Sequence, residues 1–370
     1  MDRRLFLNRV MNGLKLALLL GAVPVMPSLK KTAASNAEHE KDLPIKNMTL
    51  RAIAGEKLHH DHDRFVNPFT RIVHGRLSRV LYWKLFADNR FKGYYKEERV
   101  HPVSIDWEPV RDSSGLSVTF LKHASILIKD IDRYMVVDPV FSSFFWGIQD
   151  FTPFAFDIEN MPRPQHVLIT HGHYDHLDKR TLAGFGKDTH VISPLGYDAV
   201  FKDLGMSHRT QLDWFESFEQ EGRQIRLLPC NHWSMRNPLV GPNRSLWGSF
   251  LIKTLSGFTI FIAGDTGYFA GFRELGQEFK IDLAIFNLGA YEPRWFMAPS
   301  HMNPKETVQA FQELGAAHLL IVHWGTFRLG DEPVHFPPIE MRREIEKKGL
   351  SRKWIPLRHG ETLYCDELSG

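Results

Sequence analysis

The sequence predicts an α/β protein of the α+β type, in which layered β-sheets are covered by helices. Short apolar runs rich in β-branched residues, typical of strands, recur from about residue 116 onward. Helical segments separate several of these runs, so hairpins and β-α alternation are both expected, and this combination indicates sheets with helices on their outer faces. The chain has 370 residues, 43% of them hydrophobic, which is enough apolar material for a large core.

The amino-terminal residues 1–37 have the organisation of a targeting signal. Arg3 and Arg4 precede an apolar stretch from Leu14 to Val23, which ends in prolines and small residues. This stretch is too short to span a bilayer comfortably, and the adjacent arginines resemble a bacterial twin-arginine signal. We therefore expect export to the periplasm or the membrane surface. An uncleaved anchor and a disordered tail are the alternatives.

Residues 38–115 are predicted to be a linker followed by a helical extension. The stretch 38–64 has no periodicity, and its histidines at positions 59, 60 and 62 are expected to form a solvated run. Residues 70–86 have the spacing of an amphipathic helix. This helix either docks on the domain core or touches a membrane surface through aromatic side chains. Those side chains are Tyr82, Trp83 and Phe86.

The main domain is predicted to occupy residues 116–370. The runs at 116–121, 124–129 and 133–141 indicate an antiparallel group of strands. Further strands are expected at 165–170, 189–194, 223–229, 258–264, 282–288 and 318–324. The segment 303–315 is a predicted helix because proline stands at an early helical position and glycine at its end.

Composition excludes several classes of site. The two cysteines, Cys230 and Cys365, lie far apart and form no C-x-x-C pattern, so neither a thiolate metal site nor a disulfide framework is indicated. The whole chain has a formal net charge of +3, but residues 1–37 contribute +5 and the remainder carries −2. Because nucleic-acid binding depends on cationic patches, we do not expect a nucleic-acid partner.

Histidines and aspartates follow four of the predicted strands directly. The nine residues THGHYDHLD at 170–178 follow one strand, and three other strands each end just before a histidine or an aspartate. Site residues gather at strand ends in α/β proteins, so these side chains are expected to meet. The candidate ligands are His171, His173, Asp175, His176, His232, Asp265 and His323.

Seven ligands are too many for one catalytic ion, which takes a few protein ligands and keeps one position open. They suit two ions that share one carboxylate, and Asp265 can bridge because a carboxylate has two oxygens. Nitrogen and oxygen ligands fit two Zn²⁺ ions, with Mn²⁺ or Fe²⁺ as alternatives.

The sequence resembles the metallo-β-lactamase superfamily, whose hallmark is the H-x-H-x-D-H pattern. Within it, the chain resembles the branch of N-acyl-phosphatidylethanolamine-hydrolysing phospholipase D and its bacterial relatives. The motifs that carry the resemblance are FLKHASILI, DPVFSS, HGHYDHLD, NHWSMR, SLWGSF, FIAGDTGY, GAYEPRWFM and VHWGTF, in this order between residues 116 and 365. The resemblance implies the αβ/βα four-layer sandwich of that superfamily, with metals at one edge of two facing sheets.

By that resemblance, His171, His173 and His232 would hold one ion, and Asp175, His176 and His323 the other, with Asp265 between them. His301 would lie near the metals and contact phosphate, or else cap the following helix. His123 would orient a ligand or simply be buried. Trp295, Phe296 and Met297 would line an acyl groove or pack. Two departures, Lys122 at a position where glycine is common and Cys230 just before His232, put the substrate's shape in doubt.

The expected reaction is phospholipase D-type hydrolysis of an N-acyl-phosphatidylethanolamine-like lipid at a membrane surface. A hydroxide bridging two metals would attack phosphorus, with Asp265, Asp175 and His301 as the catalytic side chains. The products would be phosphatidic acid and an N-acylethanolamine. A lactonase or other carboxylic ester hydrolase of the same fold is the main alternative, followed by a nuclease and a periplasmic metal-binding protein without catalysis.

Overall fold

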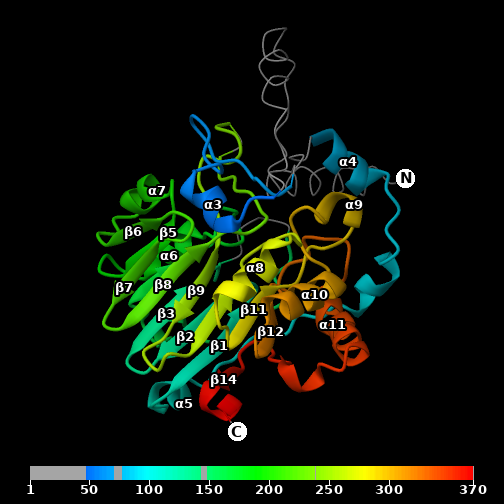
Figure 1. Cartoon of the computed structure of the whole chain (residues 1–370). Helices are drawn as coiled ribbons and strands as arrows, with labels where there is room; N and C mark the ends of the chain where they lie inside the picture. Colours follow the sequence, from blue (N-terminus) through cyan, green and yellow to red (C-terminus); the bar gives the residue numbers. More distant parts are fainter. Residues whose placement is uncertain (1–46, 71–76, 143–147, 238, 370) are drawn as a thin grey trace.

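The computed structural model describes residues 47–70, 77–142, 148–237 and 239–369. The chain folds into two seven-stranded β-sheets that face each other, with helices on both outer sides (Figure 1). The predicted fold class is confirmed. The predicted signal at residues 1–37 lies outside the described residues.

The first sheet has the strand order β14-β1-β2-β3-β4-β5-β6. The β1, β2 and β3 strands are antiparallel, as the apolar runs predicted, and β3 to β6 are parallel. The bounds are β1 Leu116–Lys122, β2 Ser125–Asp130, β3 Arg133–Val137, β4 His166–Leu168, β5 His190–Pro194, β6 Arg209–Leu212 and β14 Thr362–Tyr364.

The second sheet has the order β13-β12-β11-β10-β9-β8-β7. Its β7 to β10 strands are antiparallel and β10 to β13 are parallel. The bounds are β7 Ser217–Gln220, β8 Arg223–Leu228, β9 Ser249–Lys253, β10 Thr259–Ile262, β11 Leu283–Asn287, β12 His318–Val322 and β13 Trp354–Ile355. The β7, β9 and β13 strands, like β6 and β14 of the first sheet, were not expected from the sequence.

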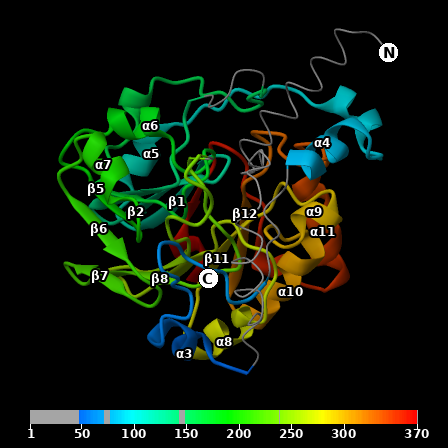
Figure 2. The ribbon, with the colours of Figure 1, turned by 90° about the horizontal axis from the view of Figure 1, so that it is seen from above.

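The helices lie in two outer layers (Figure 2). One layer contains α5 Trp107–Asp112, α6 Lys179–Gly184 and α7 Asp198–Asp203; the other contains α8 Gly271–Glu278, α10 Pro304–Leu314 and α11 Phe336–Lys347. The predicted helix at 303–315 is confirmed as α10. Asn303 and Glu306 form a reciprocal capping box at its start, and Gly315 ends it at φ 66°, a conformation that favours glycine. The 3₁₀ helices are η1 Lys92–Glu97, η2 Ile158–Asn160, η3 Ser351–Lys353 and η4 Cys365–Ser369.

Three apolar layers hold the sandwich together. The central one lies between the sheets and includes Phe120, Leu227 and Phe250. A second lies between the second sheet and the helices α8, α10 and α11. The third lies between the first sheet and α5 to α7. The strands at the centre of each sheet are covered on both faces. The residues of these strands are therefore apolar in continuous runs and do not alternate with polar residues.

The amino-terminal extension is packed against this domain. The α3 helix, Leu50–Gly55, places Ile53 in the central layer with 2% of its surface exposed. His59 is completely buried, where its ring stacks on Trp214 at 4.1 Å and its Nε2 lies 2.6 Å from Asp213 Oδ1. The expectation of a solvated histidine run is therefore wrong for His59, because an aromatic platform and a buried carboxylate receive it.

The α4 helix, Leu77–Leu85, docks on the domain instead of lying free. Val80 and Trp83 are buried, and the Trp83 indole N–H donates to Asp331 Oδ2 at 2.9 Å. Tyr82 and Phe86 remain exposed, at 58% and 72%. The helix therefore docks on the domain, as one of the two alternatives predicted, and two of the three aromatic side chains face outward. Among the described residues, no helix is both long and apolar enough to cross a membrane.

Candidate metal centre

The ends of β4, β8, β10 and β12 meet at one edge of the two sheets, and all seven predicted ligands come together there. His171 to His176 follow β4, His232 follows β8, Asp265 follows β10 and His323 follows β12. All seven side chains are buried, with 0–7% of their surface exposed. They fall into two neighbouring groups of possible ligands.

The first group contains His171, His173, His232 and Asp265. His173 Nδ1 lies 2.8 Å from His171 Nε2 and 3.3 Å from His232 Nε2. Asp265 Oδ2 lies 4.0 Å from His171 Nε2. The ring nitrogens of three different histidines therefore face one small volume.

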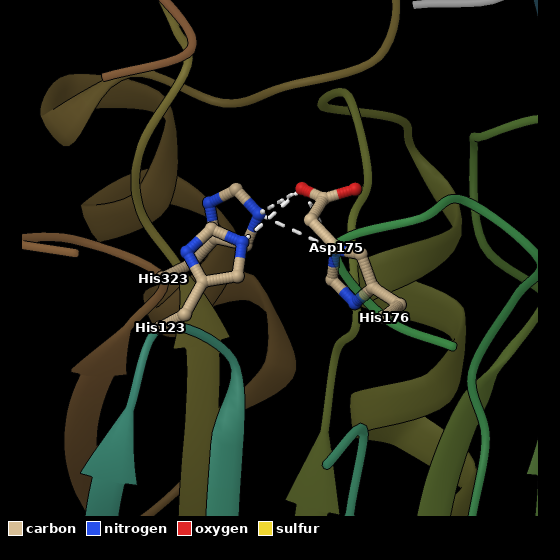
Figure 3. A group of neighbouring side chains, drawn as sticks. All are labelled: His123, Asp175, His176 and His323. Carbon is tan, nitrogen blue, oxygen red and sulfur yellow. Dashed lines mark hydrogen bonds and ion pairs between the residues drawn. The ribbon is translucent and has the colours of Figure 1, made fainter. Parts of the chain in front are cut away.

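The second group contains Asp175, His176 and His323, together with His123 (Figure 3). Asp175 Oδ2 lies 3.7 Å from His176 Nε2, 3.5 Å from His323 Nε2 and 3.1 Å from His123 Nε2. His123 and His323 approach from one side, with Asp175 and His176 facing them. His123 thus contacts a candidate ligand directly, which agrees with an orienting role.

Asp265 lies between the two groups. Its Oδ2 is 3.2 Å from His176 Nε2, and its Oδ1 is 3.3 Å from His323 Nε2. Because the same carboxylate also belongs to the first group, it has the position that a bridging ligand requires. The assignment of these side chains as ligands stays a prediction, and their convergence is an observation.

Outer hydrogen bonds fix the orientation of the candidate ligands. His176 Nδ1 lies 2.7 Å from Asp138 Oδ2, and His232 Nδ1 lies 3.1 Å from the Ser300 carbonyl. Each Nδ1–H donates outward, which fixes the ring so that its Nε2 faces the centre. The Asn287 amide likewise donates to Asp265 Oδ1 at 2.8 Å.

Sequence reasoning missed Asp138 and Asn287. Both obey the rule that found the ligands, because Asp138 directly follows β3 and Asn287 is the last residue of β11. An extension of the strand-end search to every strand would have found them.

The donor set fits divalent cations. Burial lowers the pKa of His171 and His232 well below the usual value, and lowers that of His173 to about 4, so these rings are neutral. Burial alone would raise the pKa of Asp265, but the surrounding histidines, His176 first, hold it well below the usual range. His173 Nε2 and His323 Nδ1 have no hydrogen-bond partner although they are buried. Neutral imidazoles and ionised carboxylates are the ligands that zinc and related metals prefer.

His301 lies beside the groups, as predicted. Its Nδ1 is 3.8 Å from Asp265 Oδ2, and burial lowers its pKa to about 4. It faces a narrow cavity of about 20 Å³, which is also lined by His173, Asp175, Trp233, Asp265, Ala290 and Leu329. This volume suits a water molecule or a single substrate oxygen. A neutral ring at that position can donate one hydrogen bond to such an oxygen.

Backbone strain accumulates around the centre. His123, Asp138, Ala290 and His323 have positive φ angles of 50°, 42°, 55° and 69° although none is glycine. Such conformations persist where the surrounding structure enforces them, typically at functional sites. Glycine at position 289 lets the chain pass close to the backbone of His323, because a Cβ on Gly289 would lie 2.3 Å from the His323 carbonyl oxygen.

The two departures from the family pattern are both buried. The Lys122 ammonium pairs with the Asp150 carboxylate and lies 5.2 Å from the Phe154 ring centre. Cys230 is part of the central apolar layer, and burial raises the pKa of its thiol. Neither side chain lies in the cavity beside the metal centre.

Together the fold and this donor set define a metal-dependent hydrolase of the metallo-β-lactamase type. Residues 133–324 match the family model described as the β-lactamase superfamily domain. That match covers more than half of the chain, so the chain belongs to this superfamily, as the motifs indicated.

Two relatives have similar sequences and carry the name of the branch that the motifs resemble. The mitochondrial N-acyl-phosphatidylethanolamine-hydrolyzing phospholipase D of Saccharomyces cerevisiae is 34% identical over 249 residues, 63% of this chain and 51% of that protein. N-acyl-phosphatidylethanolamine-hydrolyzing phospholipase D 1 of Caenorhabditis elegans is 31% identical over 265 residues, 66% of this chain and 73% of that protein. The match therefore spans about half the length of the yeast relative.

A solved structure supports the fold alone. The isothiocyanate hydrolase from Delia radicum gut bacteria superposes with a TM-score of 0.56 at 19% identity, covering 67% of this chain and 98% of that chain.

The loop at 329–334 supports one wall of the cavity. Its Glu332 is buried and accepts hydrogen bonds from the backbone N–H groups of Tyr291, at 3.1 Å, and Glu292, at 3.0 Å. Burial raises the pKa of Glu332 from 4.5 to about 8. Between about pH 4.5 and pH 8 the Glu332 carboxyl is therefore protonated in the folded protein and ionised in the unfolded chain.

We predict that this proton makes folding stability depend on pH. The stability that protonated Glu332 contributes is complete below about pH 4.5 and is lost as the pH rises through about 8. Glu332→Gln stays neutral, so its free energy of unfolding should fall less between pH 5.5 and 8.5 than that of the unaltered protein. Denaturant unfolding at several pH values measures this, with the exposed Glu56→Gln as the control. Equal slopes for Glu332→Gln and the unaltered protein would contradict the assignment.

Proposed function

We propose that the protein is a two-metal phosphodiesterase of the phospholipase D type that hydrolyses N-acyl-phosphatidylethanolamine-like lipids to phosphatidic acid and an N-acylethanolamine. The observation that carries this proposal is the seven-residue donor set, with Asp265 between its two halves, in a chain 31–34% identical to enzymes of that name. Because the yeast relative is matched over only half its length, the substrate is inferred for this chain and tested below.

We propose two Zn²⁺ ions as the resident metals, with Mn²⁺ or Fe²⁺ as alternatives. His171, His173 and His232 would hold one ion, Asp175, His176 and His323 the other, and Asp265 both. When bound, two close divalent cations supply an activated water and stabilise negative charge on the substrate oxygens.

The chain's own residues orient the substrate and move protons. His301 is neutral and would donate its ring N–H to a non-bridging phosphate oxygen in the cavity. Asp175 and Asp265 have pKa values held well below the usual range despite burial, chiefly by His176, so both are carboxylates that can accept a proton. Asp265 is the better placed to pass a proton to the leaving alkoxide, since it borders both groups.

An apolar surface next to the cavity suits the lipid part of the substrate. Ala290 and Leu329 line the cavity and pack in one cluster with Val80 and Trp83 of α4 and Met297 of α9, Arg294–Met297. Exposed aromatic side chains lie on or next to these two helices: Tyr82 in α4, Phe86 directly after it, and Trp295 in α9, the last 46% exposed. Figure 1 places α4 and α9 next to each other. We propose that this surface, called here the aromatic rim, contacts the membrane. Met297 itself is buried and packs, whereas the Trp295 side chain is partly exposed on this surface.

The donor set predicts the metal content. The unaltered protein should carry about two ions per chain, and His176→Ala or His323→Ala should retain about one, because each removes a ligand of the second group only. Asp265→Asn should lower kcat by at least about 100-fold, since it alters both groups. Elemental analysis and kinetics measure this, with His318→Ala, a histidine at the far end of β12, as the control. A fully active protein with one ion would contradict the two-metal assignment.

The aromatic rim predicts a preference for long-chain lipid in vesicles. Each buried methylene is worth about 0.8 kcal/mol, so rates should fall steeply as acyl chains shorten. Tyr82→Ala, Phe86→Ala and Trp295→Ala combined should weaken vesicle binding while hydrolysis of a short soluble phosphodiester changes less than about twofold. Leu255→Ala is the control, because this exposed residue lies in the β9–β10 turn, at the opposite end of β10 from Asp265. Faster cleavage of lactones than lipids, without a gain from vesicles, would favour the lactonase.

We also propose export by the twin-arginine route, which the sequence of residues 1–37 suggests. Replacing Arg3 and Arg4 with lysine should leave the full-length protein in the cytoplasm of a bacterial host. Cell fractionation with immunoblotting measures the distribution. Cytoplasmic, uncleaved protein with both arginines present would rule this proposal out.

A further inference from the structure

We propose that Asn67, in the amino-terminal extension, is a positioning residue that holds the backbone of His232 in place for metal binding. The inference rests on the proposed two-metal function. It assigns a role to a residue that lies far outside the matched domain at 133–324.

The Asn67 side chain uses both ends of its amide. The amide nitrogen lies 2.9 Å from Asn231 Oδ1 and 2.9 Å from the His232 carbonyl oxygen, so it donates to both. The amide oxygen accepts the backbone N–H groups of Phe69, at 2.9 Å, and Thr70, at 3.2 Å. Only 7% of Asn67 is exposed, so water cannot replace these partners without opening the structure.

The contacted loop connects two ligand-bearing segments. The Asn231 N–H donates to Thr266 Oγ1 at 3.0 Å, and the Gly267 N–H donates to the Asn231 carbonyl at 2.9 Å. Thr266 directly follows Asp265 in the chain. Asn67 therefore lies where the His232 loop meets the Asp265 loop, and a shift of its amide would displace both.

Contacts on both sides of Asn67 fix it to the domain. On one side, Asp213 binds three groups of the extension, with Oδ1 2.6 Å from His59 Nε2 and Oδ2 2.6 Å from Lys57 Nζ and 2.9 Å from His60 Nε2. On the other side, the Phe69 ring packs 4.8 Å from the Phe269 ring centre. The amide is thus held in a defined place before any metal binds, which is what a preorganised ligand support requires.

The Asn67→Asp variant removes the two hydrogen bonds that the amide donates while it keeps the size and shape of the side chain. The variant keeps an oxygen for the Phe69 and Thr70 N–H groups, but it turns a carboxylate oxygen toward two acceptors, Asn231 Oδ1 and the His232 carbonyl. An added negative charge alone would strengthen cation binding, so a loss of affinity has to come from the displaced loop. We expect the affinity for one Zn²⁺ per chain to fall at least about tenfold. The visible spectrum of the Co²⁺-substituted protein should change as well.

Competition with a chromophoric chelator measures the Zn²⁺ affinities of full-length protein. Ile53→Ala is the matched control, because its aliphatic side chain packs the same extension onto the central core and cannot hydrogen-bond to His232. It should lower the midpoint of thermal unfolding while both Zn²⁺ affinities stay as in the unaltered protein. If Asn67→Asp does not fold, Asn67→Ser replaces it, and the same loss is expected because a short hydroxyl cannot reach both acceptors.

The outcomes separate this inference from the proposed function. Two tightly bound Zn²⁺ ions in the unaltered protein, with unchanged affinities in the Asn67 variants, would overturn the role of Asn67 and leave the two-metal centre standing. An equal loss of affinity in Ile53→Ala would also overturn it, because general loosening would then explain the effect. Absence of tight Zn²⁺ binding in the unaltered protein would contradict both.

Discussion

The arrangement of this protein depends on the burial of two carboxylates, Asp175 and Asp265, among the ring nitrogens of clustered histidines. Buried charges are costly unless opposite charges compensate them. Ring nitrogens only 2.8 Å and 3.3 Å apart, such as those between His173 and its neighbours, cannot all satisfy one another by hydrogen bonding. Divalent cations would balance both the charge and the lone pairs, and the remaining features of the site follow from the need to hold these donors in place.

Several structural features serve that need. Asp138, the Ser300 carbonyl and Asn287 orient the donors from outside, and the positive φ angles at His123 and His323 turn two loops sharply at the sheet edge. Two sheets with three apolar layers provide a rigid base for loops that would otherwise move independently. Because the rigid part is the sandwich and the chemistry is on the loops, the fold alone does not decide the substrate.

The sequence predicted the ligand convergence because strand periodicity and strand ends are local signals. Three of the four ligand-bearing strands are short apolar runs, whereas β8 alternates apolar residues with Gln224 and Arg226. In each case the polar residue after the strand is conspicuous. The β7 strand escaped prediction because Ser217–Gln220 is a partly exposed edge segment with no apolar run. The burial of His59 was not expected, and that of Trp83 was left open, for a different reason. Their burial depends on partners, Asp213 and Asp331, that are more than 150 residues away in the chain, and no local pattern reveals such contacts.

Hydrolysis in ¹⁸O-labelled water tests the central claim most directly. The metal-loaded protein would be incubated with N-acyl-phosphatidylethanolamine vesicles in H₂¹⁸O, and the products analysed by mass spectrometry. Attack at phosphorus predicts one ¹⁸O atom in phosphatidic acid and none in the N-acylethanolamine, with the label lost when a chelator removes the metal. Label in a released fatty acid, with unlabelled or absent phosphatidic acid, would contradict the account and identify a carboxylic ester hydrolase instead.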